Sequence, residues 1–370
     1  MTDHLFDVQE MDLNFGPQHP STHGVLRLKL KVDGERVIGC YPVIGYLHRG
    51  TEKLFELHPF FQNVPHTDRM DYVAAATNNL AYVGAVEKLL GLTPTPRTQY
   101  IRTLLCELQR ISSHLLWLAT HAIDIGAMTP FFYTFREREL ILDLFEEYCG
   151  ARLTLNCMRP GGMPYDLPVG WVDRCRKFVD TFPEKIHEYE GLLTNNRIWK
   201  QRTVGVGVIS KELAIDYALT GPMLRGSGVA WDLRKEQPYA AYDQVEFDVP
   251  VREEGDTYAR YLVRMEEMRQ SNRIIIQCLD DLPDGPIDCK KPRVLKAPKE
   301  SEAYYSIEGP KGEIGFYIVG DGTPQPHRCH VRAPSFVNLQ CLPDLVEGHL
   351  LADLVAIIGT TDIVLGEVDR

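Results

Sequence analysis

Two histidines four residues apart, His19 and His23, have the side chains and the spacing that most readily suggest chemistry in this chain. In a helix this spacing would place both imidazoles on one face, as in many metal sites. A helix is not expected here, because Pro20 lacks an N–H and drives His19 toward extended geometry. We therefore predict a rigid loop that leads into a strand, with a histidine able to exchange protons near neutral pH. The alternative interpretation is a turn with two surface histidines.

Asp124 is a second candidate, because it lies between two isoleucines near the end of a predicted helix. Burying a carboxylate there is unfavourable unless a partner compensates its charge. That partner could be His121, one helical turn earlier, or a distant residue such as His23, whose imidazolium form the carboxylate would favour. The alternative is a solvated aspartate at a helix end.

Tyr72 and Arg49 are weaker candidates when each is considered alone. Tyr72 lies at the start of a predicted helix, where its phenol could donate a proton or simply pack with a satisfied hydroxyl. Arg49 follows an apolar strand in a polar turn, where it could stabilise an anion, tune a redox centre or be an ordinary surface arginine.

Hydrophobic periodicity predicts the elements that position these residues. Strands are expected at residues 25–32 and 37–41, joined as a hairpin, and again at 303–307 and 315–319. Long helices are expected from Asp68 to a stop at Gly91 and at residues 97–125, 131–148, 168–193 and 257–282, with Pro183 breaking the fourth. A short helix is expected near residues 211–219.

These elements predict an α+β fold in which strand-rich parts flank a long helical bundle. The expected division is a strand-rich region at residues 1–65 that carries the histidine loop, a helical core at 66–285, and a strand-rich region with a tail at 286–370. Residues 284–300, rich in proline and lysine, are expected to form an exposed excursion.

Composition excludes several classes of function. The formal net charge of -11 argues against nucleic acid or anionic lipid as the main partner. No segment has the length of a membrane span or the layout of a signal peptide, so we expect a soluble chain. The nine cysteines contain no Cys-x-x-Cys pair and lack zinc or iron–sulfur spacing, so we expect no metal site and mostly core cysteines. No phosphate loop, dinucleotide fingerprint or nucleophile elbow is present.

The exact order of several longer segments is more specific than any of these patterns. From about Asn14 to Arg370 the chain closely resembles the D-subunit family of NADH-quinone oxidoreductase, respiratory complex I. The segments that carry the resemblance are NFGPQHPSTHGVLR (14–27), YLHRGTEK (46–53), DIGAMTPFF (124–132), FRERE (135–139), RAPSFVNLQ (332–340) and GEVDR (366–370).

The resemblance implies a fold like the large subunit of nickel–iron hydrogenases and a place in the peripheral arm of the complex, at the cytoplasmic side of the inner membrane. A small neighbouring subunit would carry a 4Fe–4S cluster, and quinone would be reduced between the two subunits. The headgroup residues of the family fall on His23 and Tyr72, and the carboxylate that pairs with the histidine falls on Asp124. The arginines near the cluster fall on Arg49 and Arg69. Reduced quinone needs donors at both carbonyl oxygens, which two such residues could supply.

Two departures narrow the interpretation. The regions that hold paired metal-binding cysteines in the hydrogenases read HRGT (48–51) and DIVLGE (362–367) here, which argues against a hydrogenase. Many relatives also have a histidine near the cluster where this chain has Thr154, so proton uptake at that position is in doubt. The alternatives that stay open are the same role in a complex fed by ferredoxin or a deazaflavin, and a scaffold that only positions the cluster-bearing neighbour.

Overall fold

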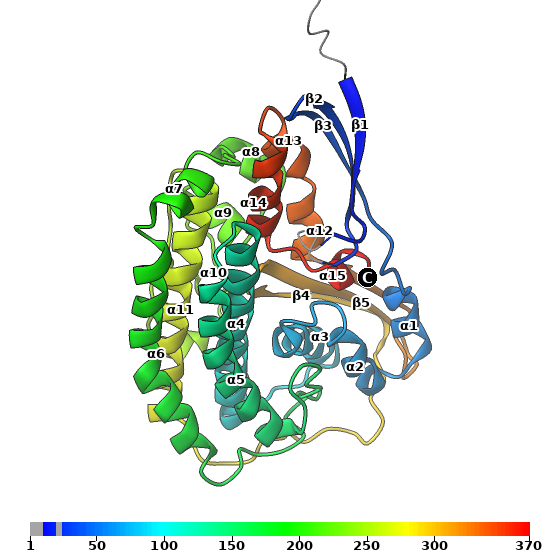
Figure 1. Ribbon diagram of the computed structural model, residues 1–370. Coiled ribbons are helices and arrows are strands. Elements are labelled where there is room, and N and C mark those ends of the chain that lie inside the picture. The colour runs from blue at the N-terminus through cyan, green and yellow to red at the C-terminus, as the bar shows by residue number, and fades with distance from the viewer. Residues whose placement is uncertain (1–9, 20–23) are drawn as a thin grey trace, which may run out of the picture.

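The computed structural model describes residues 10–19 and 24–370, which form two three-stranded antiparallel sheets and a set of helices (Figure 1). His23 lies outside the described residues. The first sheet has the order β1 (Glu10–Phe15), β2 (Arg27–Asp33), β3 (Arg36–Val43). The second has the order β4 (Lys299–Gly309), β5 (Gly312–Asp321), β6 (Arg328–Arg332). The predicted N-terminal hairpin is confirmed as the antiparallel pair β2–β3.

Long helices form the body of the molecule, and most of them stand side by side in Figure 1. One of them, α3, packs on the second sheet. The long helices are α3 (Ala75–Leu90), α4 (Pro96–Asp124), α5 (Thr129–Cys149), α6 (Trp171–Leu193) and α11 (Thr257–Asp280). An α+β architecture is therefore confirmed, while the hydrogenase-like arrangement and the three expected regions stay predictions.

Short helices connect these layers. Before α3 lie α1 (Thr51–Leu57), η2 (Phe60–Asn63) and α2 (Val64–Thr67). Between α6 and the second sheet, besides α11, lie α7 (Arg197–Thr203), α8 (Lys211–Asp216), α9 (Pro222–Arg225), α10 (Leu233–Glu236) and η3 (Tyr242–Gln244). The C-terminal part contains α12 (Pro334–Leu339), α13 (Leu342–Val346), α14 (Leu351–Thr361) and α15 (Leu365–Val368).

Local signals explain where α4 begins. Pro96 occupies the first turn, where its missing N–H costs nothing, and the Thr95 hydroxyl accepts a hydrogen bond from the backbone N–H of Thr98. Gly91 ends α3 in the left-handed conformation, with φ of 64°. The predicted helix over residues 97–125 and the predicted stop at Gly91 are therefore confirmed.

Pro183 does not break α6, contrary to the prediction. A proline removes the hydrogen bond to the carbonyl four residues earlier, which here belongs to Val179. The side-chain amide of Asn272, on α11, donates to that carbonyl at 3.0 Å instead. The helix therefore continues through Pro183 because a neighbouring helix supplies the missing donor.

The first long helix begins at Ala75 rather than near Asp68, so Tyr72 lies in a turn and not in a helix as predicted. The Asp71 carboxylate accepts a hydrogen bond from the backbone N–H of Val73 at 3.1 Å, a local bond that competes with helix formation. Asn78 and Gln109 hold the same turn from α3 and α4, through the carbonyls of Asp71 and Val73.

Two clusters of buried apolar residues form the core of the described chain. The larger one joins the long helices to the second sheet. The smaller one packs the first sheet against residues from α8, α9 and the C-terminal helices α13–α15. Residues near the two ends of the chain therefore share one core.

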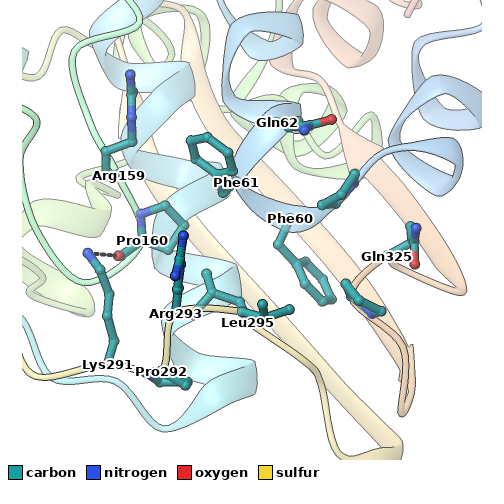
Figure 2. Close-up of a pocket in the computed structure, with 13 residues that line it drawn as sticks. Phe60, Phe61, Gln62, Arg159, Pro160, Lys291, Pro292, Arg293, Leu295 and Gln325 are labelled. Atoms are coloured by element: carbon teal, nitrogen blue, oxygen red, sulfur yellow. Dashed lines mark hydrogen bonds between the residues drawn. The ribbon is translucent and has the colours of Figure 1, made fainter.

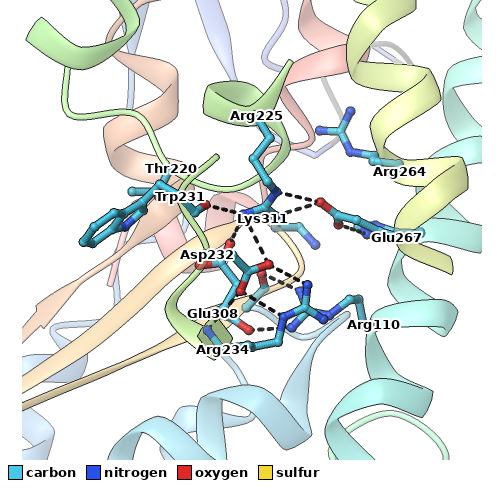
Figure 3. A network of polar contacts seen from close by, with 12 residues as sticks. Arg110, Thr220, Arg225, Trp231, Asp232, Arg234, Arg264, Glu267, Glu308 and Lys311 are labelled. Atoms are coloured by element: carbon cyan, nitrogen blue, oxygen red, sulfur yellow. Dashed lines mark hydrogen bonds and ion pairs between the residues drawn. The ribbon is translucent and has the colours of Figure 1, made fainter. Parts of the chain in front are cut away.

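A network of charged residues is also buried between α4, α11 and the second sheet (Figure 3). Arg225 donates to Glu267 at 2.7 Å and to Glu308 at 2.7 Å, and Arg234 donates to Asp232. We call this set the ion network; its members are Glu107, Arg110, His114, Arg225, Asp232, Arg234, Glu267 and Glu308.

None of the helices among residues 10–19 and 24–370 combines the length and the apolar character that a membrane crossing requires.

Candidate functional site

Hydrogen bonds join the two chain segments that flank residues 20–23, at the base of the loop that contains His19 and His23. Asn14 and Arg27, the two ends of the predicted segment, are joined by hydrogen bonds from Nε and Nη2 of Arg27 to Oδ1 of Asn14 at 3.0 and 2.8 Å. His19 and Gly24 form an antiparallel bridge, and the His19 ring lies 4.3 Å from that of Phe15. The described residues thus fix where the chain enters and leaves the segment that contains His23.

Tyr72 lies half-buried in the turn before α3. Burial raises the pKa of its phenol, the negative charge of Asp71 raises it further, and Lys311 partly offsets both. The phenol is therefore protonated at neutral pH and available as a hydrogen-bond and proton donor.

The C-terminal helix α15 lies between the exit of the histidine loop and Tyr72. A Cβ atom at Gly24 would lie 3.2 Å from Cδ1 of Leu365. A Cβ atom at Gly366, the next residue, would lie 2.7 Å from the Met70 carbonyl oxygen and 3.4 Å from Cδ1 of Tyr72. Tyr72 and the loop exit therefore lie against neighbouring residues of the same short helix, α15.

Asp124 is the last residue of α4 and is half-buried. A Cβ atom at Gly359, in α14, would overlap Nδ1 of His121 and lie 3.4 Å from Oδ2 of Asp124. His121 is buried between the rings of Trp117 and Trp199, each 5.3 Å away. Asp124 and His121 thus face the same helix, which leads directly into the segment that carries Gly366.

Arg49 and Arg69 are exposed and lie near one another around His66. Burial lowers the pKa of His66, and the positive charges of His58 and the two arginines lower it further, so these basic side chains make this face electropositive. Nη1 of Arg69 donates to the Pro65 carbonyl at 2.6 Å. The neighbouring Asp68 is buried and accepts the backbone N–H of Asn156, two residues after Thr154, at 3.0 Å. The loop that contains Thr154 therefore adjoins the arginine face.

The segment that carries Arg49 is anchored by the end of the sequence. The Asp369 carboxylate accepts the backbone N–H groups of Gly45 and Leu47, each at 2.8 Å, and its carbonyl oxygen contacts Nδ1 of His48 at 2.9 Å. Sequence reasoning missed this role and that of Gly359 and Leu365, because contacts between the two ends of a chain leave no local spacing signal.

A cavity of about 540 Å³ opens beside η2 and the extended loop at residues 291–295 (Figure 2). Arg49, Arg69, Tyr72 and Asp124, the predicted site residues that the structure describes, do not line it. Phe61, Gln62 and Arg159 belong both to this cavity and to a smaller hollow that reaches His66 at the arginine face. Nζ of Lys291 closes one wall by donating to the Pro160 carbonyl at 2.8 Å (Figure 2). The cavity is thus a feature separate from Tyr72.

Comparison with known proteins decides the family. A sequence model described as "Respiratory-chain NADH dehydrogenase, 49 Kd subunit" matches residues 124–301 and 294–370. The chain is 57% identical over 371 residues to D-subunit 2 of the NADH-quinone oxidoreductase of Solibacter usitatus, with 100% of both chains covered. The chain belongs to this family. It is also 54% identical over 366 residues to the D-subunit of Geobacillus kaustophilus, with 99% of this chain and 100% of the relative covered. The D-subunit of Geotalea uraniireducens is 52% identical over 384 residues, with 97% and 98% covered.

Membership in the D-subunit family confirms the resemblance found in the sequence. Asp124 is the first residue matched by the family model, whereas the alignment with the Solibacter relative also spans His23, Arg49, Arg69 and Tyr72.

Proposed function

We propose that this chain is a peripheral-arm component of a proton-translocating NADH-quinone oxidoreductase and forms, with an adjacent 4Fe–4S subunit, the site where quinone is reduced and protonated. The observation that carries the proposal is the position of α15, which contacts both the exit of the histidine loop and Tyr72. Tyr72 and Gly24, the residue that follows the segment containing His23, thereby lie against one element of the fold.

The proposed chemistry follows from the needs of a quinone. Its reduction to quinol adds two electrons and two protons, and negative charge develops on both carbonyl oxygens. In the proposal Tyr72 donates to one oxygen and His23 to the other. A phenol with a raised pKa keeps its proton until a strongly basic oxygen forms, which suits a donor that acts only on the reduced quinone.

Asp124 would orient His23 and favour its protonated form. When the proton leaves for the quinone, the carboxylate is left with an unbalanced charge at the end of α4. In the proposal this change of charge starts proton pumping by membrane-embedded subunits of the complex.

The electropositive face around Arg49 and Arg69 would meet the cluster-bearing subunit. Thiolate-ligated clusters carry net negative charge, so two exposed guanidinium groups, whose positive charge also lowers the pKa of His66, fit such a neighbour. The bound cluster supplies electrons, and this chain supplies positive charge and proton donors. In the proposal quinone is a substrate of the complex. The chain would lie at the cytoplasmic side of the inner membrane, together with other peripheral-arm subunits.

Replacing Tyr72 by phenylalanine tests the proposal. We expect Tyr72→Phe to lower the quinone-reductase kcat of the assembled complex by about 100-fold, the lower end of the usual effect of a proton donor. The terminal cluster should stay present and reducible, which its EPR signal reports.

Tyr217→Phe is the matched control, since Tyr217 is also half-buried and also donates from its hydroxyl, to Asp344 at 2.7 Å, but follows α8 and makes this contact at the surface. It should leave activity unchanged. Full activity in Tyr72→Phe would instead favour a scaffold that positions the cluster-bearing neighbour while quinone binds elsewhere.

A further inference from the structure

A buried lysine lies next to the turn that carries Tyr72. Nζ of Lys311, in the β4–β5 turn, lies 3.2 Å from Oδ2 of Asp71 and 3.8 Å from Oδ2 of Asp362, and it donates to the Ser113 hydroxyl at 2.9 Å. Lys311 and Asp71 are each only 3% exposed. We call the following set the Lys311 cluster: Asp71, Arg264, Lys311, Asp362 and Glu367.

The other members come from the C-terminal segment and from α11. Glu367 is 1% exposed, and its Oε2 accepts the backbone N–H of Ser335 at 3.0 Å. Nε of Arg264 lies 4.0 Å from Oδ2 of Asp362. Arg264 also faces Glu267 and Arg225 of the ion network (Figure 3).

Among the described residues, Arg370 also faces Glu367. It is shared with other acidic groups, because its Nε lies 3.8 Å from Glu52, and it donates to the Val331 carbonyl.

Charge balance favours a proton on one carboxyl group of the Lys311 cluster. Three carboxyl groups face two cationic groups, and leaving a net charge buried is costly. Burial and the charge of Asp71 raise the pKa of Glu367 to about 7, although Ser335 and Lys311 oppose this shift. Burial also raises the pKa of Asp71, against the opposing effect of Lys311. At neutral pH the Lys311 cluster therefore retains a carboxylic-acid proton for a large part of the time.

Asp362 is held in an unusual geometry within this cluster. Its φ of 52° lies in the left-handed region, which costs about 1 kcal/mol for a non-glycine residue. Its Oδ2 is buried and accepts no hydrogen bond from the described residues. Such an oxygen can accept a proton or a proton-carrying water without displacing an existing bond.

The cluster is in contact with Tyr72 through two routes. Asp71 is the preceding residue in the chain, and its charge acts on the phenol. Gly366, which precedes Glu367, packs on the Tyr72 ring and on the Met70 carbonyl.

We propose that the Lys311 cluster stores one carboxylic-acid proton and returns it to Tyr72 after Tyr72 has protonated quinone. The inference rests on the proposed function of Tyr72. In the first transfer the phenol O–H bond breaks and a quinol O–H bond forms. In the second the carboxylic O–H bond of Glu367 breaks and the phenol O–H bond forms again. Asp71, whose charge acts on both groups, would relay this proton, and solvent then refills the cluster. Glu367 and Asp71 act as positioning residues, because neither has to touch quinone.

The second transfer runs in the favourable direction. Tyr72 has a pKa raised above the ordinary value for tyrosine, whereas Glu367 has a pKa of about 7. A tyrosinate beside a protonated Glu367 is therefore the stronger base and takes the proton.

Glu367→Gln in the assembled complex tests whether the Lys311 cluster stores this proton. Glutamine keeps the shape of the side chain and an oxygen that can accept the Ser335 N–H, but it cannot release a proton. Below pH 7 we expect the kcat for quinone reduction to fall about tenfold or more. In the unmodified complex kcat should fall as pH rises through about 7, where the store empties, so that the two proteins converge above that pH. Glu347→Gln, at an exposed position after α13, is the matched control and should keep the original pH profile.

Infrared difference spectroscopy gives a second measurement that does not depend on turnover. The carboxylic-acid carbonyl band of the complex should lose intensity as pH rises through about 7, and this change should be missing in Glu367→Gln. An equal loss of kcat at every pH, or an infrared change that persists in Glu367→Gln, would overturn the store. Full activity in Tyr72→Phe would instead overturn the proposed function itself, so the two failures are distinguishable.

Discussion

Gly359 shows how closely the residues around Asp124 are packed. It lies in α14 against His121 and Asp124, and the Trp117 indole donates to its carbonyl oxygen at 2.8 Å. A side chain at this position would have to displace a buried imidazole that two tryptophans hold in place. The absence of a side chain at Gly359 thus sets the distance between α4 and α14.

We expect Gly359→Ala to destabilise the chain by about 1–3 kcal/mol, the usual cost of overpacking a core. It should also lower quinone-reductase activity, because Asp124 shifts with the end of α4. Gly191→Ala is the control: Gly191 lies in α6 with nothing within 4 Å of a new Cβ, so alanine should be neutral or stabilising. Thermal unfolding and activity of the purified complex measure both effects. Equal Tm values for the two variants would contradict this account of Gly359.

At the scale of elements, α6 is continuous because α11 replaces the hydrogen bond that Pro183 cannot make. The Val179 carbonyl is buried, and Pro183 has no N–H to donate to it. The Asn272 amide supplies a hydrogen bond in place of the ordinary helical one. The two helices are therefore joined by a polar contact as well as by apolar packing.

A double-mutant cycle tests this compensation. Asn272→Leu should cost about 1–3 kcal/mol, the penalty for a buried acceptor left unsatisfied. In a Pro183→Ala background the cost should be smaller by about 1 kcal/mol, because the N–H of the new alanine can donate to the Val179 carbonyl. Denaturant midpoints of the four proteins give the coupling energy. Additive effects would show that Pro183 and Asn272 do not share this carbonyl.

The elements also show which features the sequence can predict. Helix α4 was predictable because Thr95, Pro96 and the apolar stripe that follows are all local signals. The continuity of α6 was not, because the relevant donor, Asn272, lies far along the chain. The turn at Tyr72 was missed because the apolar spacing of residues 70–90 fits a helix, while one hydrogen bond from Val73 to Asp71 favours a turn.

The residues of the candidate site also differ in whether local sequence signals indicate them. His23, Tyr72 and Asp124 could be named as candidates because their residue types stand out in short segments; their roles stay predictions, and His23 lies outside the described residues. Lys311 gave no signal, since a lysine in a Pro-Lys-Gly turn is usually exposed, whereas here it is 3% exposed. Its burial depends on Asp71 and Asp362, which come from distant parts of the sequence.

At the scale of the whole molecule, the ion network places many charges in the interior of a protein whose net charge is -11. Arg225 is its centre, with hydrogen bonds to Glu267, Glu308 and the Trp231 carbonyl. These contacts use the planar guanidinium group in several directions at once, which a lysine cannot reproduce. The network ties α9 and α11 to the second sheet.

Arg225→Met should destabilise the protein by about 3–5 kcal/mol, because it leaves buried carboxylates without a partner. Arg273→Met removes an exposed pair with Asp248, at 3.2 Å, and should cost about 1 kcal/mol or less. The yield of assembled complex and its Tm separate the two outcomes. Similar losses in both variants would show that the network adds little beyond a surface ion pair.

The contact between the first sheet and the C-terminal segment also has a consequence for biosynthesis. Gly45 and Asp369 are hydrogen-bonded although 324 residues separate them in the sequence. At a translation rate of roughly 5–20 residues per second, the second partner emerges tens of seconds after the first. During that interval the apolar face of β2 and β3 has no C-terminal helices to cover it. The nascent chain therefore carries an uncovered sheet while the intervening residues are synthesised, and α15 can pack against Tyr72 only after that interval.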